Sequence, residues 1–213
     1  MDLLSIVILI LILLFSVIFH EVAHGVVAEH LGDPTARYAG RLTLNPIPHI
    51  DLFGSILLPA ILLIFHSPFL FGAAKPVPVN YQNLRNFRKD MILVAFAGPA
   101  TNFLLAIMAA IAYRLFPNTS PLAGSILLEV VILNLVLAVF NLIPIPPLDG
   151  SKILASLLGF VDRGIMYWIL ELERYGFILI ILFLFTGLFT AILIPTVSFF
   201  AGLLLGTGVN LGF

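Results

Sequence analysis

Residues 3–31 read LLSIVILILILLFSVIFHEVAHGVVAEHL, an apolar run that is interrupted near its end by His20, Glu21 and His24. The run is long enough for a membrane helix, and the Gly-Asp-Pro sequence after it predicts the helix end. Residues four apart lie on one face of a helix, so both imidazoles project to the same side. From Leu3 to His20 the helix rises roughly 26 Å, which places the polar turn near the membrane face where the helix exits.

Composition assigns the whole chain to a lipid environment. Of its 213 residues, 61% are hydrophobic and only 10% are charged, and a soluble domain cannot bury that much apolar surface. The net charge of −1 excludes no partner by itself, but no basic stripe that could follow phosphates is present, so we expect no nucleic-acid partner. The chain has no cysteine, so a metal site must use His, Asp and Glu. We expect one domain over residues 1–213.

The hydropathy pattern predicts an all-α polytopic membrane protein with about five to six transmembrane segments. Residues 52–71 are nearly long enough to span, but glycine and prolines interrupt them, so a re-entrant segment is the alternative. Residues 38–48 begin with alternating strand formers and predict a short β-strand or hairpin. A short helix is expected at 151–158, and the other expected spans are 3–31, 91–115, 123–142, 166–187 and 191–209.

Basic residues constrain the orientation of the chain. If residues 52–71 form a re-entrant segment, the basic residues after the first helix lie on one side of the membrane, with the single exception of Arg114. Basic loops face the cytoplasm. We therefore expect an outside N-terminus, five full crossings and a polar helix end near the cytoplasmic face of the cell membrane. If residues 52–71 crossed the membrane fully, the polar end of the first helix and Asp149 would lie on opposite sides of the membrane.

The spacing His20-Glu21-x-x-His24 is typical of zinc sites, in which both histidines bind one ion and the glutamate handles a proton. Short patterns also occur by chance. In the alternative interpretation, the two histidines line a polar helix interface and Glu21 pairs with a loop arginine. Ionisable residues near membrane depth are costly without a role, which favours the metal site.

A catalytic zinc usually takes three protein ligands, so a third must come from elsewhere in the chain. We favour Asp149, because it follows a predicted span in a proline-rich break and precedes Gly150, which lets the backbone turn. A carboxylate in this position can also be only the N-cap of the helix at 151–158. The candidates are His30, His49, His66, Glu29, Asp51, Glu129 and Asp149.

Three motifs occur in order along the chain: His20-Glu21-x-x-His24, Ala97-Gly98-Pro99-Ala100-Thr101-Asn102, and Asn141-x-x-Pro144-x-Pro146-x-x-Asp149-Gly150. In order and spacing they resemble the site-2 protease family of intramembrane zinc metalloproteases. Residues 71–80, FGAAKPVPVN, are similar to the branch of that family without appended PDZ or CBS domains.

The resemblance implies that His20, His24 and Asp149 bind one Zn²⁺ per chain and that Glu21 is the general base. It implies that Asn141 helps to hold the substrate strand, although an asparagine at a helix end can be only a C-cap. The implied activity is that of a zinc metalloendopeptidase that cleaves within or near transmembrane segments, in regulated intramembrane proteolysis. Implied substrates are membrane proteins such as anti-sigma factors or membrane-tethered regulators, which an edge near residues 38–44 could receive by strand addition.

Two other functions remain as alternatives. Transporters place ionisable residues on broken helices, often in duplicated halves, and a membrane zinc-binding or transport protein would fit the histidines. The chain has no second HExxH-like half, and transport gives Glu21 no evident task. An inactive, protease-like chaperone is the other alternative, against which the intact HExxH motif and Asp149 argue.

Overall fold

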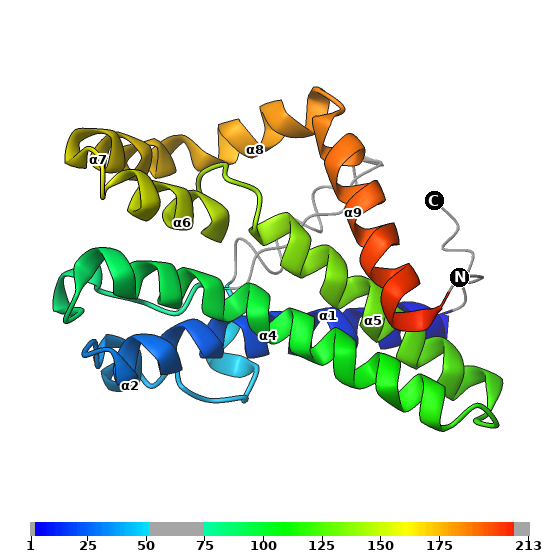
Figure 1. The fold of residues 1–213 in the computed structure, drawn as a ribbon. Helices are drawn as coiled ribbons and strands as arrows, with labels where there is room; N and C mark the ends of the chain where they lie inside the picture. Colours follow the sequence, from blue (N-terminus) through cyan, green and yellow to red (C-terminus); the bar gives the residue numbers. More distant parts are fainter. Residues whose placement is uncertain (1–2, 52–74, 207–213) are drawn as a thin grey trace.

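The structure, a computed structural model, describes residues 3–51 and 75–206, and within these ranges it is helical with no β-strand (Figure 1). This confirms the predicted all-α class. Three short 3-10 turns, η1 (Ile47–His49), η3 (Tyr81–Asn83) and η4 (Leu172–Tyr175), accompany the helices. The helices are α1 (Leu3–His30), α2 (Thr35–Tyr38), α4 (Phe87–Leu115), α5 (Pro121–Asn141), α6 (Asp149–Leu158), α7 (Arg163–Glu171), α8 (Gly176–Phe185) and α9 (Leu188–Leu205).

Three of these helices, α1, α4 and α5, are long and apolar enough to cross a membrane. Only 17% of the most apolar window of α1 is buried inside the protein, so most of its leucine and isoleucine side chains are left for lipid. In length and composition these three helices are those of a membrane protein. The bent pair formed by residues 163–185 and 190–205 would be a fourth span. The predicted re-entrant segment at 52–71 lies outside the described residues, so the count of five to six stays a prediction.

The span expected at 166–187 is not one regular helix, and whether it crosses the membrane stays a prediction. The 3-10 turn η4 separates α7 from α8, and the chain bends by 81° before α9. Glu173 and Arg174 lie in η4, where charged side chains do not enter lipid readily. α8 has 10 residues, or about 15 Å of helix, which is half of a bilayer core. Gly187 has φ of +71° and separates α8 from α9.

The strand predicted near 38–48 is absent, and residues 39–46 form a turn followed by bends. Gly40 has φ of +66°, a conformation that reverses the chain and suits glycine. Farther along, Thr43 Oγ1 accepts a hydrogen bond from the Asn45 amide, and Asn45 Oδ1 accepts one from the Ile47 amide. These local side-chain bonds satisfy backbone donors that a sheet would otherwise pair. No strand edge is therefore available here to receive a substrate.

Helix packing forms three apolar clusters in the part of the chain that the structure describes, and the smallest of them joins Ile143, Leu148 and Phe183. In the first, small residues of α4 such as Ala106 and Ala110 let α5 and α9 approach closely, as is usual between membrane helices. In the second, α1, α4, α6 and α7 meet around Met91 and Met166. Figure 1 shows α6 and α7 above the first half of α4, with α1 on the other side of that helix. The histidine face of α1 is thereby turned toward the start of α6.

Candidate metal centre

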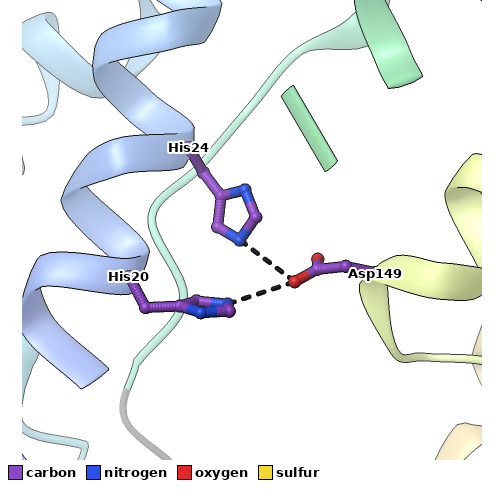
Figure 2. Close-up of side chains that lie close together, drawn as sticks. All are labelled: His20, His24 and Asp149. Carbon is purple, nitrogen blue, oxygen red and sulfur yellow. Dashed lines mark hydrogen bonds and ion pairs between the residues drawn. The ribbon is translucent and has the colours of Figure 1, made fainter. Parts of the chain in front are cut away.

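His20 and His24 of α1 point toward Asp149, the first residue of α6 (Figure 2). His20 Nε2 lies 3.1 Å from Asp149 Oδ2, and His24 Nε2 lies 3.3 Å from the same oxygen. All three side chains are buried, and one ligand atom from each lies within 4.8 Å of the others. This is the one group of three or more possible metal ligands among the described residues.

The outer ring nitrogens of both histidines are engaged by hydrogen bonds. His24 Nδ1 lies 2.7 Å from the Val94 carbonyl oxygen, which can only accept, so this nitrogen carries the proton. His20 Nδ1 lies 2.6 Å from Asn102 Oδ1. In the neutral ring one nitrogen is a donor and the other an acceptor. Protons on both Nδ1 atoms therefore leave both Nε2 lone pairs directed at the centre.

A buried network determines which way Asn102 faces. Asn134 Nδ2 donates to the Val130 carbonyl oxygen and to Ser16 Oγ, at 2.9 Å in each case. Asn134 Oδ1 is then left to accept from Asn102 Nδ2 at 2.8 Å. Asn102 must therefore turn its oxygen toward His20. Asn102, Asn134 and Ser16 are all buried, so the network fixes the His20 tautomer from within the helix bundle.

Sequence reasoning did not assign a role to Asn102, although the residue ends the quoted AGPATN motif. The signal was an amide in the middle of an apolar helix, since such a residue needs a buried partner. Replacing Asn102 with Leu is expected to weaken zinc binding by about 10- to 100-fold, because His20 loses the partner that orients its ring. Competition with a chromogenic chelator measures this, and Asn141→Leu serves as a control that should leave zinc affinity unchanged. Equal losses in both variants would contradict the assigned role.

The arrangement fits a divalent cation. Two Nε2 lone pairs and a carboxylate oxygen that face each other repel unless a proton or cation lies between them. Ligands at about 2.0–2.1 Å from a tetrahedral zinc lie roughly 3.3 Å apart, and the observed separations to Asp149 Oδ2 are 3.1 and 3.3 Å. Gly98 leaves room beside the two rings, because it has no side chain. A Cβ at this position would lie 2.5 Å from both Nε2 atoms.

Asp149 is held in place by its own neighbours. It is the first residue of α6, whose N-cap is Leu148, and no side chain caps the helix, so the N-cap interpretation of Asp149 does not hold. A Cβ on Gly150 would lie 2.2 Å from the Leu142 carbonyl oxygen, which explains the glycine there. Burial raises the pKa of Asp149, but when no ion is bound and the rings of His20 and His24 are protonated, their hydrogen bonds and charges outweigh burial and hold the pKa well below its usual range. The carboxylate is therefore charged, as a metal ligand must be.

A second layer of charge surrounds Asp149. Lys152 Nζ lies 3.9 Å from Asp149 Oδ1 and 3.9 Å from Glu173 Oε1. Burial lowers the pKa of Lys152, but the negative charges of Asp149 and Glu173, and of Tyr81 once it ionises, raise it by more, so the net shift is upward. Burial also raises the pKa of Tyr81 to about 12 and shifts that of Glu173 upward. Lys152 is thus a fixed positive charge beside the centre.

Glu21, the predicted general base, lies on α1 next to the centre and is half-buried. Its Oε2 accepts a hydrogen bond of 2.8 Å from the Val77 amide. Val77 is flanked by Pro76 and Pro78, which have no amide hydrogen, so its N–H is the one backbone donor of that triplet. No local pattern predicts this contact, which joins residues 56 positions apart.

The remaining predicted site residues lie elsewhere. Asn141 is the last residue of α5, and its Nδ2 donates a hydrogen bond of 2.9 Å to the Leu137 carbonyl oxygen in the same helix. The role of Asn141 toward substrate stays a prediction. Glu29 pairs with Arg37, His30 bonds to the Val26 carbonyl, and His49 bonds to the Thr43 carbonyl. None of the described alternatives to Asp149 joins the group, and His66 lies outside the described residues.

Comparisons with known proteins agree with this geometry. The sequence model of "Peptidase family M50" matches residues 123–185, which include Asp149. "Putative zinc metalloprotease YwhC" of Bacillus subtilis strain 168 is 38% identical over 198 residues, covering 89% of this chain and 85% of that protein. "Putative zinc metalloprotease Rip2" of Mycolicibacterium smegmatis is 27% identical over 81% of this chain and 64% of that protein. "Putative zinc metalloprotease MJ0611" of Methanocaldococcus jannaschii is 33% identical over 64% of this chain and 63% of that protein.

No solved structure matches the chain. The B. subtilis relative is similar over most of both chains, and the family match includes the region of Asp149. The chain therefore belongs to peptidase family M50, the site-2 protease family of metalloproteases.

Proposed function

We propose that this M50 metalloprotease is an intramembrane zinc enzyme that hydrolyses peptide bonds within or near the transmembrane segments of other membrane proteins. The observation that carries the proposal is the meeting of His20, His24 and Asp149, with both Nδ1 atoms engaged and both Nε2 atoms facing the carboxylate. Zinc is the expected ion, because two imidazoles, one carboxylate and an open position are typical of catalytic zinc. The names of the two relatives, both zinc metalloproteases, support the same metal.

The residues of the chain would divide the chemistry between them. His20, His24 and Asp149 would hold the ion, which when bound supplies a Lewis acid that acidifies water and polarises the scissile carbonyl. Glu21 would take the water proton on its carboxylate and pass it to the leaving amine. The Val77 amide, 2.8 Å from Glu21 Oε2, would keep that carboxylate from swinging away. A substrate helix must unwind locally, because each helical carbonyl is bonded to the amide four residues on.

Metal removal tests the proposal. The purified chain in lipid nanodiscs is expected to cleave a single-span model substrate, to lose cleavage after treatment with a zinc chelator and to regain it when stoichiometric zinc is added. Product is measured by mass spectrometry, which also locates the cleaved bond. Cleavage that persists in zinc-free protein would contradict the proposal. Zinc flux into sealed vesicles without any cleavage would favour the transport alternative.

The enzyme is proposed to be multi-pass, with the metal centre near the cytoplasmic face of the cell membrane. The distribution of basic residues supports this orientation. Arg114 is the one basic residue in the last turn of α4, whereas Arg85, Arg88 and Lys89 cluster at its start. Reporter fusions at positions 80 and 118 are expected to report cytoplasmic and outside locations, respectively. A reporter at position 80 that lies outside would overturn this orientation. Substrates proposed are single-span regulatory proteins such as anti-sigma factors or membrane-tethered transcription regulators.

A further inference from the structure

A cavity of about 350 Å³ lies between the start of α4 and the start of α7, away from the metal centre. Arg85, Arg88 and Arg163 all line it, and no acidic residue does. It is bounded further by Asn86, Phe87, Met166 and Tyr167. A cavity with three guanidinium groups and no carboxylate selects an anion.

The arginines in this cavity have charge left for a ligand. Neither Arg85 nor Arg163 belongs to an ion pair in the part of the chain that the structure describes, and both side chains are exposed. Arg88 is anchored differently, since its Nη1 donates to the Gly159 carbonyl at 2.7 Å and its guanidinium lies 4.8 Å from the centre of the Phe160 ring. Neither the carbonyl nor the ring carries a net negative charge, so the Arg88 guanidinium keeps its net positive charge.

Nearby carboxylates do not pair with the arginines of the cavity. Asp90 Oδ2 accepts the Asn86 amide at 2.7 Å, and Asp162 Oδ1 accepts the Gly164 amide at 2.6 Å. Both carboxylates therefore cap their own helix starts, where negative charge is stabilised. Neither carboxylate forms an ion pair with an arginine of the cavity, so the guanidinium groups of Arg85 and Arg163 keep their donors for a bound anion.

Depth in the membrane identifies the anion. α4 is a candidate span that begins at Phe87, so Arg85 and Arg88 lie at the level of lipid headgroups on one face of the bilayer. On α7, Tyr167 and Trp168 are exposed, as aromatic residues in a membrane interface commonly are. A phosphate at this level is abundant as the phosphodiester of an anionic phospholipid, whose acyl chains would lie against the neighbouring apolar helix surface.

We propose that this cavity binds the phosphodiester headgroup of an anionic phospholipid, with Arg85 and Arg163 as its principal ligands and Arg88 as a third. The lipid would connect the start of α4 to the start of α7. Met166, which lines the cavity, packs in the same apolar cluster as Met91 and Val94 of α4. Because the Val94 carbonyl holds His24, the lipid would stabilise the packing on which the metal centre depends.

Lipid retention tests the proposal without any assay of proteolysis. The full chain is placed in nanodiscs of mixed phosphatidylcholine and phosphatidylglycerol, and retained phosphatidylglycerol is counted by native mass spectrometry after release. The double variant Arg85→Gln/Arg163→Gln is expected to weaken phosphatidylglycerol binding about tenfold or more, because it removes two of the three guanidinium groups that line the cavity and can donate hydrogen bonds to the phosphodiester. Arg85→Lys/Arg163→Lys keeps the charge and is expected to retain most of the binding.

The matched control is Arg37→Gln/Lys89→Gln, which removes the same charge from two exposed side chains outside the cavity and should leave lipid retention close to wild type. Equal loss in both double variants would overturn the proposal, since binding would then follow net charge alone. Inorganic phosphate is added in a second arm and is not expected to displace the lipid. Displacement by inorganic phosphate would assign the cavity to a soluble phosphate and would also overturn the proposal.

Discussion

Replacing Glu21 with Gln is expected to lower the cleavage rate by about 100- to 10,000-fold while zinc content stays at one ion per chain. Glutamine keeps the size of the side chain and can still accept the hydrogen bond from the Val77 amide, 2.8 Å away in the wild type. It cannot accept the water proton. The measurement pairs single-turnover cleavage of a membrane substrate in nanodiscs with zinc analysis of the same sample.

The Glu29→Gln variant is the matched control for this change, because Glu29 lies on the same helix and pairs with Arg37, away from the centre. It should cleave at close to the wild-type rate. Glu21→Gln protein that still cleaves at the wild-type rate would remove Glu21 from the mechanism. Glu21→Gln protein that loses its zinc would show that the glutamate organises the site and that its effect is not proton transfer alone.

Replacing Gly98 with Ala is expected to weaken zinc binding and cleavage by about 100-fold or more. In an ordinary helix this substitution stabilises by about 1 kcal/mol, because alanine is the better helix former. Here the added methyl would lie 2.5 Å from both His20 Nε2 and His24 Nε2. The rings must turn away from the ion to make room, and misplacement of ligands by about 1 Å costs activity on that scale.

Gly202→Ala in α9 is the control for the Gly98 variant, since nothing lies within 4 Å of a Cβ at that position. It should leave cleavage unchanged and raise the unfolding temperature slightly. Zinc affinity by chelator competition and unfolding temperature are measured for both variants. Full zinc affinity in Gly98→Ala would contradict the packing of the two rings against this glycine.

Local patterns in the sequence predicted the two histidines and the glutamate, because helical spacing alone places His20 and His24 on one face. Asp149 was less certain, since it is 129 residues from His20 and several other carboxylates and histidines were candidates. Its contact depends on how α6 packs against α4 and α1, which a single sequence does not reveal. Gly98 and Asn102 were visible as parts of a motif, but their roles became apparent only from the distances to the imidazoles.

Two elements differ from their predicted form for physical reasons that the structure supplies. Residues 38–48 contain strand formers, but side-chain bonds from Thr43 and Asn45 favour turns over a ladder. The run after residue 163 is apolar enough for a span, but charged Glu173 and Arg174 lie in the middle of it and coincide with a 3-10 turn. Hydropathy averages over a window and does not register where a helix is interrupted.

The claim on which the rest depends is that His20, His24 and Asp149 together hold one zinc ion. Zinc K-edge X-ray absorption on the purified wild type, with metal analysis of wild type and Asp149→Ala, tests it most directly. The account predicts one zinc per wild-type chain, bound by two imidazoles and oxygen ligands, and loss of most of that zinc in the variant. An Asp149→Ala protein that retains stoichiometric zinc with an unchanged spectrum would contradict it.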